Sequence, residues 1–349
     1  MKLSDYTLAL LDDIERRIDP ETEDDYYSQW EDFYNQRTDK KVFTPYRKKV
    51  STPSVELKNI HINDALADLD LMIARELTDI SKRLSARAPA LGIRANYGTG
   101  IMTSLFGAEI FEMPRETNTL PTTKSFGDTD KIRDIVEKGM PDLNVALGKK
   151  VLEFGEACAE TFEKYPNIKK YVRVYHPDTQ GPLDIAELLW GGEMFYEMYD
   201  DPDFVKDFMS LVTSTYKAFM DKWYEIIPMI RNGLNLHWSL MHKGTILLRS
   251  DSAMNLSSEF HREFSLPYDK ELLDYYGGGC VHFCGRGDHY IQNLLELDNM
   301  YGINMSQPHL NDMEKIIDLV SEYGKTILDL PSAEKYAEYE KVKPGMIKG

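Results

Sequence analysis

The sequence has little cysteine, no long apolar run and too few basic residues to balance its acids. Its three cysteines, among 349 residues, form no even disulfide framework, which indicates a reducing compartment. No apolar stretch approaches the roughly 18 residues that a membrane-spanning helix needs. An acidic residue, Asp5, follows the first residue too soon for a signal peptide. We therefore expect a cytoplasmic protein without a membrane partner.

Positive charge is scarce. The sequence has 58 Asp and Glu against 41 Lys and Arg, a formal net charge of −17 at pH 7. Nucleic acids and anionic membrane surfaces are themselves negatively charged, so this excess argues against either as the main partner. A locally positive pocket is still compatible with this negative net charge. We expect a small-molecule substrate and no nucleic-acid partner.

The first quarter of the chain lacks any regular alternation of strands and helices. The polar segment Glu21–Tyr34 is acidic and aromatic, and we expect a helix that packs by its tyrosines and tryptophan. A second pattern spaces apolar residues three and four apart and predicts one amphipathic helix; its members are Leu66, Leu69, Ile73, Leu77, Ile80 and Leu84. The prediction is an N-terminal helical extension over residues 1–90.

From residue 91 to 349, short apolar strands alternate with longer helical stretches. The eight predicted strands are 92–97, 171–175, 234–240, 245–248, 280–284, 302–305, 326–328 and 345–349. Such alternation predicts an α/β protein with a parallel sheet. Polar and glycine residues gather just after the strands, which favours a (β/α)8 TIM barrel, whose ligands bind at that face. An open doubly wound sheet is the alternative, but no Gly-x-Gly-x-x-Gly follows a predicted strand.

The strand at 280–284 carries the strongest chemical signal. Alternate residues of a strand share a face, so Cys280, His282 and Cys284 point the same way. Same-face neighbours lie about 6–7 Å apart, close enough for the imidazole of His282 and the thiol of Cys284 to tilt towards one ion. The two cysteines are about 13 Å apart and cannot share it. We predict metal ligation by His282 and Cys284, with Cys280, like Cys158, filling the core.

Three segments resemble the uroporphyrinogen decarboxylase superfamily. They are residues 181–191 (GPLDIAELLWG), residues 249–252 (RSDS) leading through Phe260 to the Leu-Pro-Tyr at 266–268, and the His-Phe-Cys-Gly at 282–285. The last is similar to the corrinoid-linked methyltransferase branch, of the methylcobalamin:coenzyme M type. That resemblance implies a (β/α)8 barrel in which His282 and Cys284 bind zinc. It also implies that the zinc activates a thiol, which takes a methyl group from a corrinoid.

The decarboxylase branch fits the sequence less well. Its arginine-rich segment Met-Arg-Gln-Ala-Gly-Arg is not recognisable, and Asn96-Tyr97-Gly98 stands near that place. A substrate with many carboxylates would lose its charge complement without those arginines.

The sequence does not identify the remaining metal ligands, because no cysteine follows Cys284. Candidates for ligation or substrate contact are His176, His237, His242, Asp251 and His309. Asp251 ends a strand at the expected catalytic face and is our predicted catalytic residue, with an Arg249–Asp251 ion pair as the alternative. The predicted substrate contacts are His176, Gln180, Asn304, Gln307 and His309.

These patterns favour a zinc-dependent methyltransferase that works with a corrinoid carried by a separate protein, since no cobalamin-binding domain is visible in the sequence. The sequence is compatible with a homodimer and does not determine the oligomeric state. Two alternatives also remain: a decarboxylase acting on uroporphyrinogen or a smaller acid, and a barrel that has lost catalysis and serves as a binding subunit.

Overall fold

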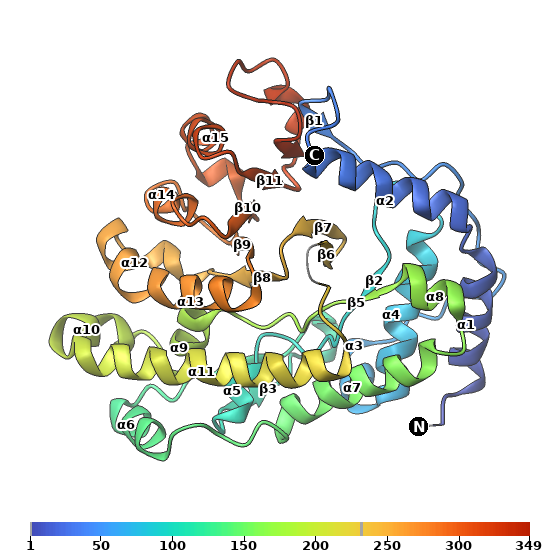
Figure 1. Ribbon diagram of the computed structural model, residues 1–349. Helices are drawn as coiled ribbons and strands as arrows, with labels where there is room; N and C mark the ends of the chain where they lie inside the picture. The colour runs from blue at the N-terminus through green and yellow to red at the C-terminus, as the bar shows by residue number, and fades with distance from the viewer. Residues whose placement is uncertain (1, 231–232) are drawn as a thin grey trace.

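In the computed structural model, which describes residues 2–230 and 233–349, the chain folds as an α/β protein with a parallel sheet and a group of N-terminal helices (Figure 1). No helix among the described residues is long and apolar enough to cross a membrane.

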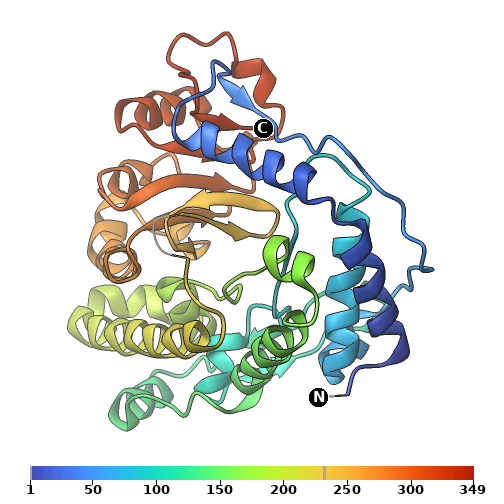
Figure 2. The ribbon, with the colours of Figure 1, turned by 45° about the vertical axis from the view of Figure 1, so that its right-hand side comes forward.

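The N-terminal segment is helical, as its patterns predicted. Its elements are α1 (Asp5–Arg17), α2 (Pro20–Tyr34), the short strand β1 (Val42–Phe43), α3 (Ile62–Ala67) and α4 (Leu69–Arg83). In Figure 2, α1 runs beside α4, and the two helices pack together. The single helix predicted over Leu66–Leu84 is wrong in one respect. It divides at Asp68, whose side chain accepts a hydrogen bond from Leu71 N at 3.1 Å and so starts a new helix.

The main sheet has six parallel strands. In spatial order they are β1, β12 (Ile347–Lys348), β11 (Thr326–Leu328), β10 (Met300–Met305), β9 (Gly279–Phe283) and β8 (Ile246–Arg249). Five of them match predicted strands. The sixth, β1, comes from the N-terminal segment and pairs with β12, so the C-terminus lies beside it (Figure 1).

Six further strands form three pairs. A parallel pair joins β2 (Gly92–Ile93) to β5 (Arg173–Val174), and antiparallel pairs join β3 (Glu109–Phe111) to β4 (Thr122–Lys124) and β6 (Leu234–His237) to β7 (Leu240–Lys243). The predicted strand 234–240 is therefore a hairpin that reverses at Trp238 and Ser239. Within the described residues no backbone ladder links β5 to β8.

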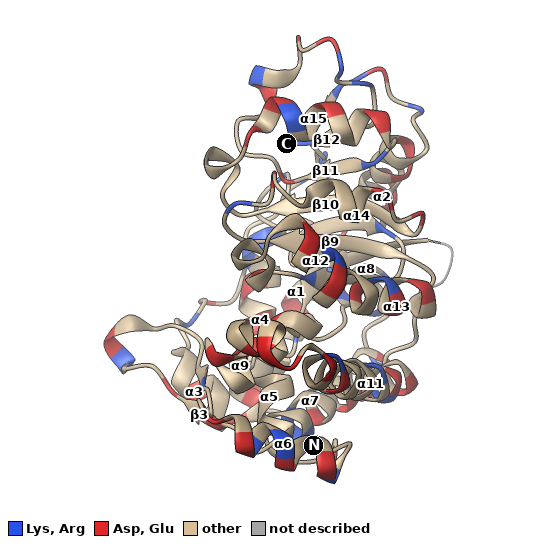
Figure 3. Ribbon diagram, turned by 90° about the vertical axis from the view of Figure 1, so that its left-hand side faces the viewer, with Lys and Arg blue, Asp and Glu red and all other residues tan. Residues whose placement is uncertain are grey.

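Helices cover the outside of the strands. They are α5 (Ile101–Leu105), α6 (Thr129–Lys138), α7 (Ala146–Phe162), α8 (Pro166–Tyr171), α9 (Pro182–Trp190), α10 (Glu193–Asp200), α11 (Pro202–Ile226), α12 (Ser258–Phe264), α13 (Leu266–Tyr276), α14 (Ile291–Leu295) and α15 (Met313–Glu322). Single 3-10 turns are η1 (Arg115–Thr117), η2 (Ser252–Asn255), η3 (Pro308–Leu310) and η4 (Ala333–Tyr336). Lys and Arg alternate with Asp and Glu along these helices (Figure 3), so the net negative charge is spread over them.

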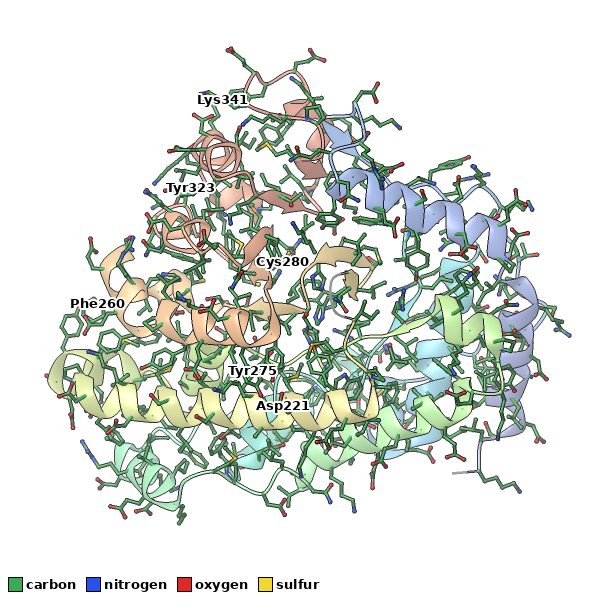
Figure 4. All side chains as sticks on the ribbon, viewed as in Figure 1. Asp221, Phe260, Tyr275, Cys280, Tyr323 and Lys341 are labelled. Carbon is green, nitrogen blue, oxygen red and sulfur yellow. The ribbon has the colours of Figure 1, made fainter. Side chains whose placement is uncertain are left out.

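Side-chain hydrogen bonds cap the N-termini of two helices and join one of them to a third. Asp201 caps α11, with its side chain accepting a hydrogen bond from Phe204 N at 3.4 Å. Asp312 caps α15, with its side chain accepting from Lys315 N at 3.1 Å. The packing of α13 on α11 includes a hydrogen bond of 2.8 Å from Tyr275 to Asp221, both labelled in Figure 4.

The glycines before β9 allow it to approach β8. A Cβ built on Gly279 would lie 1.9 Å from the carbonyl oxygen of Ile246, so any side chain would force the strands apart. Gly278 has φ of +92°, which favours glycine. These glycines therefore permit the close approach of β8 and β9, in whose register Arg249 pairs with His282.

Candidate metal centre

The candidate site residues lie at the carboxyl ends of two neighbouring parallel strands, β8 and β9. His282 is buried near the carboxyl end of β9, and Cys284 follows that strand. Asp251 follows β8, whose Arg249 is the register partner of His282. Because carboxyl ends of parallel strands meet at one edge, the three side chains converge, and one ligand atom from each lies within 4.8 Å of the others.

The distances among these atoms suit a small tetrahedral ion. His282 Nε2 lies 3.5 Å from Cys284 Sγ and 3.5 Å from Asp251 Oδ1. A tetrahedral zinc with bonds of about 2.0–2.3 Å places its nitrogen and sulfur ligands about 3.5 Å apart, and its nitrogen and oxygen ligands about 3.4 Å apart. The two distances from His282 Nε2 therefore match those of zinc ligands, and the third pair, Cys284 and Asp251, lies within 4.8 Å.

Asn304 on β10 fixes the orientation of the His282 ring. Asn304 Nδ2 donates to the carbonyl oxygen of Leu328 at 2.7 Å, which turns its amide oxygen towards His282 Nδ1, at 2.5 Å. His282 therefore donates from Nδ1, and its Nε2 carries a lone pair directed at Asp251 and Cys284. Such an outer hydrogen bond is a regular feature of metal-binding histidines.

The protonation states of the three side chains favour the binding of a cation between them. Burial lowers the pKa of His282, which keeps its ring neutral. Asp251 Oδ1 is buried without a hydrogen-bond donor among the described residues, so two acceptor atoms, Asp251 Oδ1 and His282 Nε2, face each other. A cation between them would satisfy both. Burial also raises the pKa of the Cys284 thiol to about 11, and metal binding would favour its deprotonated form.

Asp184 on α9 holds the loop that carries Asp251. Its carboxylate accepts hydrogen bonds from Asp251 N at 3.1 Å and Ser252 N at 2.7 Å. Burial and the neighbouring Asp251 raise the pKa of Asp184 to about 6. Sequence reasoning gave Asp184 no role, although it lies within the 181–191 segment that carries the family resemblance.

Asp178 is a second residue that the sequence analysis missed. It follows β5 and receives hydrogen bonds from Trp238 Nε1 at 3.0 Å and Arg249 Nη1 at 3.3 Å, besides contacts with Arg94 and His237. Burial would raise its pKa, but His237 and the two arginines hold the pKa well below its usual range. The polar loop after the strand predicted at 171–175 was the available signal.

The predicted Arg249–Asp251 ion pair is present. Arg249 Nη2 lies 2.9 Å from Asp251 Oδ2, the carboxylate oxygen other than the one nearest His282. Asp251 can therefore pair with Arg249 and offer Oδ1 to a metal at the same time.

The other predicted contacts are dispersed. His176 is buried, with Nδ1 near Pro177 O and Nε2 accepting from Leu247 N at 3.0 Å. Gln180 is buried, and its Oε1 has no hydrogen-bond partner among the described residues, whereas Gln307 Oε1 accepts from Gly285 N at 2.6 Å. His309 is exposed on η3. The roles of these residues in substrate binding stay predictions. Asn304 contacts His282.

The remaining histidine and cysteine candidates lie away from the cluster. His237 and His242 are buried on the β6–β7 hairpin, where burial lowers the pKa of each ring to about 3. Cys280 packs in the core among Leu240, Leu247 and Leu328 near the centre of Figure 4. Cys158 is buried in α7. Both cysteines are core residues, as predicted.

Comparison with solved structures shows that other proteins have a similar fold. A solved methyltransferase from Methanosarcina mazei shares this fold. The TM-score is 0.59 at 13% sequence identity, over 86% of this chain and 87% of that one. No family model matches the sequence, and no curated protein does. At this identity the similarity concerns the fold, and the site residues have to be argued from their own geometry.

Proposed function

We propose that this chain is a zinc-dependent methyltransferase that moves a methyl group from a corrinoid to a thiol. The observation that carries the proposal is the convergence of Asp251, His282 and Cys284 at zinc-ligand separations. Three protein ligands leave one of the four positions of a zinc ion for a substrate, which is the pattern of catalytic rather than structural zinc. The fold similarity to a methyltransferase agrees with it.

We further propose that the fold is the (β/α)8 barrel of the uroporphyrinogen decarboxylase superfamily. Eight strands in chain order can supply it: β2, β5, β6, β8, β9, β10, β11 and β12. Support comes from the parallel order β8 to β12, the parallel β2–β5 pair and the site's position after β8 and β9. Barrel enzymes carry their chemistry at that end of the strands.

Zinc, when bound, would supply a Lewis acid that lowers the pKa of an incoming thiol and keeps its sulfur nucleophilic at neutral pH. Asp251, His282 and Cys284 would hold it, Asn304 would aim the imidazole and Asp184 would fix the loop of Asp251. With zinc, Asp251 and a deprotonated Cys284 balance in charge. Arg94 and Arg249 then offset the carboxylates of Asp178 and Asp184, so the charged groups around the cluster add no net charge near neutral pH.

In the proposed transfer, the thiol would release its proton to solvent and its sulfur would take the methyl group from the corrinoid, with the electron pair of the carbon–cobalt bond left on cobalt. A separate corrinoid protein is the donor in this proposal, and the protein would act in the cytoplasm.

Metal content and methyl transfer test the proposal together. We expect about one zinc per chain by elemental analysis of protein purified without chelators, and none in a His282→Ala, Cys284→Ala double variant. Cys280→Ala, on the same strand but outside the cluster, is the matched control and should keep its zinc. Zinc-loaded protein should consume methylcobalamin in the presence of a thiol. Zinc without transfer would reject the activity and leave the site standing.

A further inference from the structure

The turn of the β6–β7 hairpin places an indole against the metal-site histidine. The ring centroids of Trp238 and His282 are 4.9 Å apart, and the rings meet edge to face at 80°. Trp238 has φ of +56°, a left-handed conformation that is rare for a bulky residue. The fold thus holds the backbone of Trp238 in an unfavourable conformation, and in that conformation its ring contacts a predicted zinc ligand.

Asp178 ties this turn to the strands around the site. Trp238 Nε1 donates to Asp178 Oδ2 at 3.0 Å, and His237 Nε2 lies 3.2 Å from Asp178 Oδ1. The same carboxylate pairs with Arg94 after β2 and with Arg249 at the end of β8. One buried carboxylate therefore joins the hairpin turn to two other elements.

The N-terminal extension supports the hairpin from another side. Arg83 at the end of α4 donates to the carbonyl oxygen of Trp238 at 2.9 Å, and Tyr34 on α2 donates to that of Met241 at 3.0 Å. A separate apolar cluster packs α2 on the hairpin: Tyr26, Trp30, Phe33, Phe43, Ala90, Tyr175, Leu236 and Met241. In Figure 1, α2 lies at the upper right and the β6–β7 hairpin lies nearer the centre of the molecule.

We infer that the β6–β7 hairpin forms a wall of the acceptor pocket and that Trp238 restricts the acceptor to primary, unbranched thiols. The inference rests on the proposed function. Ser306 is exposed, with Oγ 3.3 Å from the half-buried Cys284 Sγ and 3.4 Å from His282 Nε2, so solvent lies nearest to the Cys284 side of the cluster. In this proposal a sulfur enters from that side and meets the indole that packs on His282. A branched carbon beside that sulfur would need the volume that the indole occupies.

The wall is tested on zinc-loaded protein with a primary thiol and its tertiary, branched counterpart. In the Trp238→Ala variant, we expect kcat/KM for the branched thiol to rise about tenfold relative to the primary thiol, the scale of steric selection in a pocket. Trp238→Phe keeps a ring but loses the hydrogen bond to Asp178, and should stay close to the wild type. Lys243→Ala, at the far end of the hairpin from the turn, is the control for general damage.

A second measurement needs no turnover. In cobalt-substituted protein, Cys284 would itself give a thiolate-to-cobalt charge-transfer band, and a bound thiol would add to its intensity, so the increase follows the binding of each thiol. We expect the branched thiol to bind the Trp238→Ala protein about tenfold more tightly than the wild type. The ring of Trp238 lies 4.9 Å from that of the predicted metal ligand His282, so bound cobalt should quench the emission of Trp238, and Trp238→Phe should abolish that quenching.

The two proposals fail in different ways. A variant that keeps its metal but shows unchanged selectivity and unchanged thiol binding overturns the wall and leaves the proposed function intact. A wild type that binds metal and thiols without methyl transfer rejects the function, and the binding selectivity still decides for or against the wall. Absence of metal binding in the wild type overturns both.

Discussion

At the scale of single residues, the hydrogen bond between Asn304 and His282 carries the first prediction. Asn304→Ala removes the acceptor for His282 Nδ1 and leaves the carbonyl oxygen of Leu328 without its donor. We expect zinc affinity to fall about 10–100-fold, the usual cost of losing such an outer partner. Competition with a chromophoric chelator measures it. Asn299→Ala, which removes a hydrogen bond to Asp274 away from the site, is the control, and equal affinities would contradict the prediction.

Asp269 gives a prediction about pH. Burial, and then the nearby Asp184, raise the pKa of Asp269 to about 8 in the folded chain, against an ordinary value of 3.8 for an aspartate. Between these values the folded protein binds the extra proton. Its contribution to stability is therefore complete below about pH 4 and is lost as the pH rises to about 8, by up to about 1.4 kcal/mol per pH unit.

The test is urea denaturation at pH 5, 7 and 9. Asp269→Asn removes the titrating group while keeping an acceptor for Ser265, so the free energy of unfolding should fall less steeply with pH than in the wild type. Asp274→Asn on the same helix is the control, because Lys270 lowers the pKa of Asp274 and confines its effect to acidic pH. Parallel curves for Asp269→Asn and wild type would refute the assignment.

The backbone of Trp238 allows a comparison of two substitutions. Alanine keeps the Cβ that makes φ of +56° unfavourable, whereas glycine removes it. We expect Trp238→Gly to be more stable than Trp238→Ala by about 1 kcal/mol, the reverse of the usual order within secondary structure. Denaturation curves of the two variants give the answer, and a less stable glycine variant would show that the turn carries no such strain.

At the scale of elements, the sequence predicted strands and helices better than it predicted turns. The hairpin was taken for one strand because its two turn residues, Trp238 and Ser239, include neither glycine nor asparagine, the usual signals of a two-residue turn. That error hid the contact of Trp238 with His282. Asp178 was missed for a related reason: its importance comes from donors on three other elements, and no local pattern shows them.

The link between the N-terminal extension and the hairpin is open to test. Arg83→Ala removes the donor to the carbonyl oxygens of Trp238 and Ala90. We expect faster hydrogen exchange of the β6–β7 amides, because local opening requires fewer contacts to break. Arg87→Ala, which loses hydrogen bonds to Arg47 and Lys48 instead, is the matched control. Equal exchange in the two variants would mean that the extension does not hold the hairpin.

At the scale of the whole molecule, the alternation of strands and helices was enough to predict an α/β protein with a parallel sheet. It could not predict β1, because two residues, Val42 and Phe43, carry no strand pattern and owe their conformation to pairing with Ile347 and Lys348. The candidate metal site was predictable in outline. His282 and Cys284 are two residues apart at the end of β9 and can be identified from the local sequence, whereas Asp251 joins them only through the register of β8 against β9.

Because that register brings ligands from two strands together, metal binding should stabilise the whole fold. A ligand that binds only the folded state at 100 times its dissociation constant adds about 2.7 kcal/mol. For a chain of this size, we expect zinc to raise Tm by a few degrees and a chelator to reverse the rise. The Asp251→Asn, His282→Ala, Cys284→Ala triple variant should show neither change. A zinc-dependent rise of the same size in the triple variant would place the ion elsewhere, and an unchanged wild-type Tm would mean that the three side chains do not bind zinc tightly.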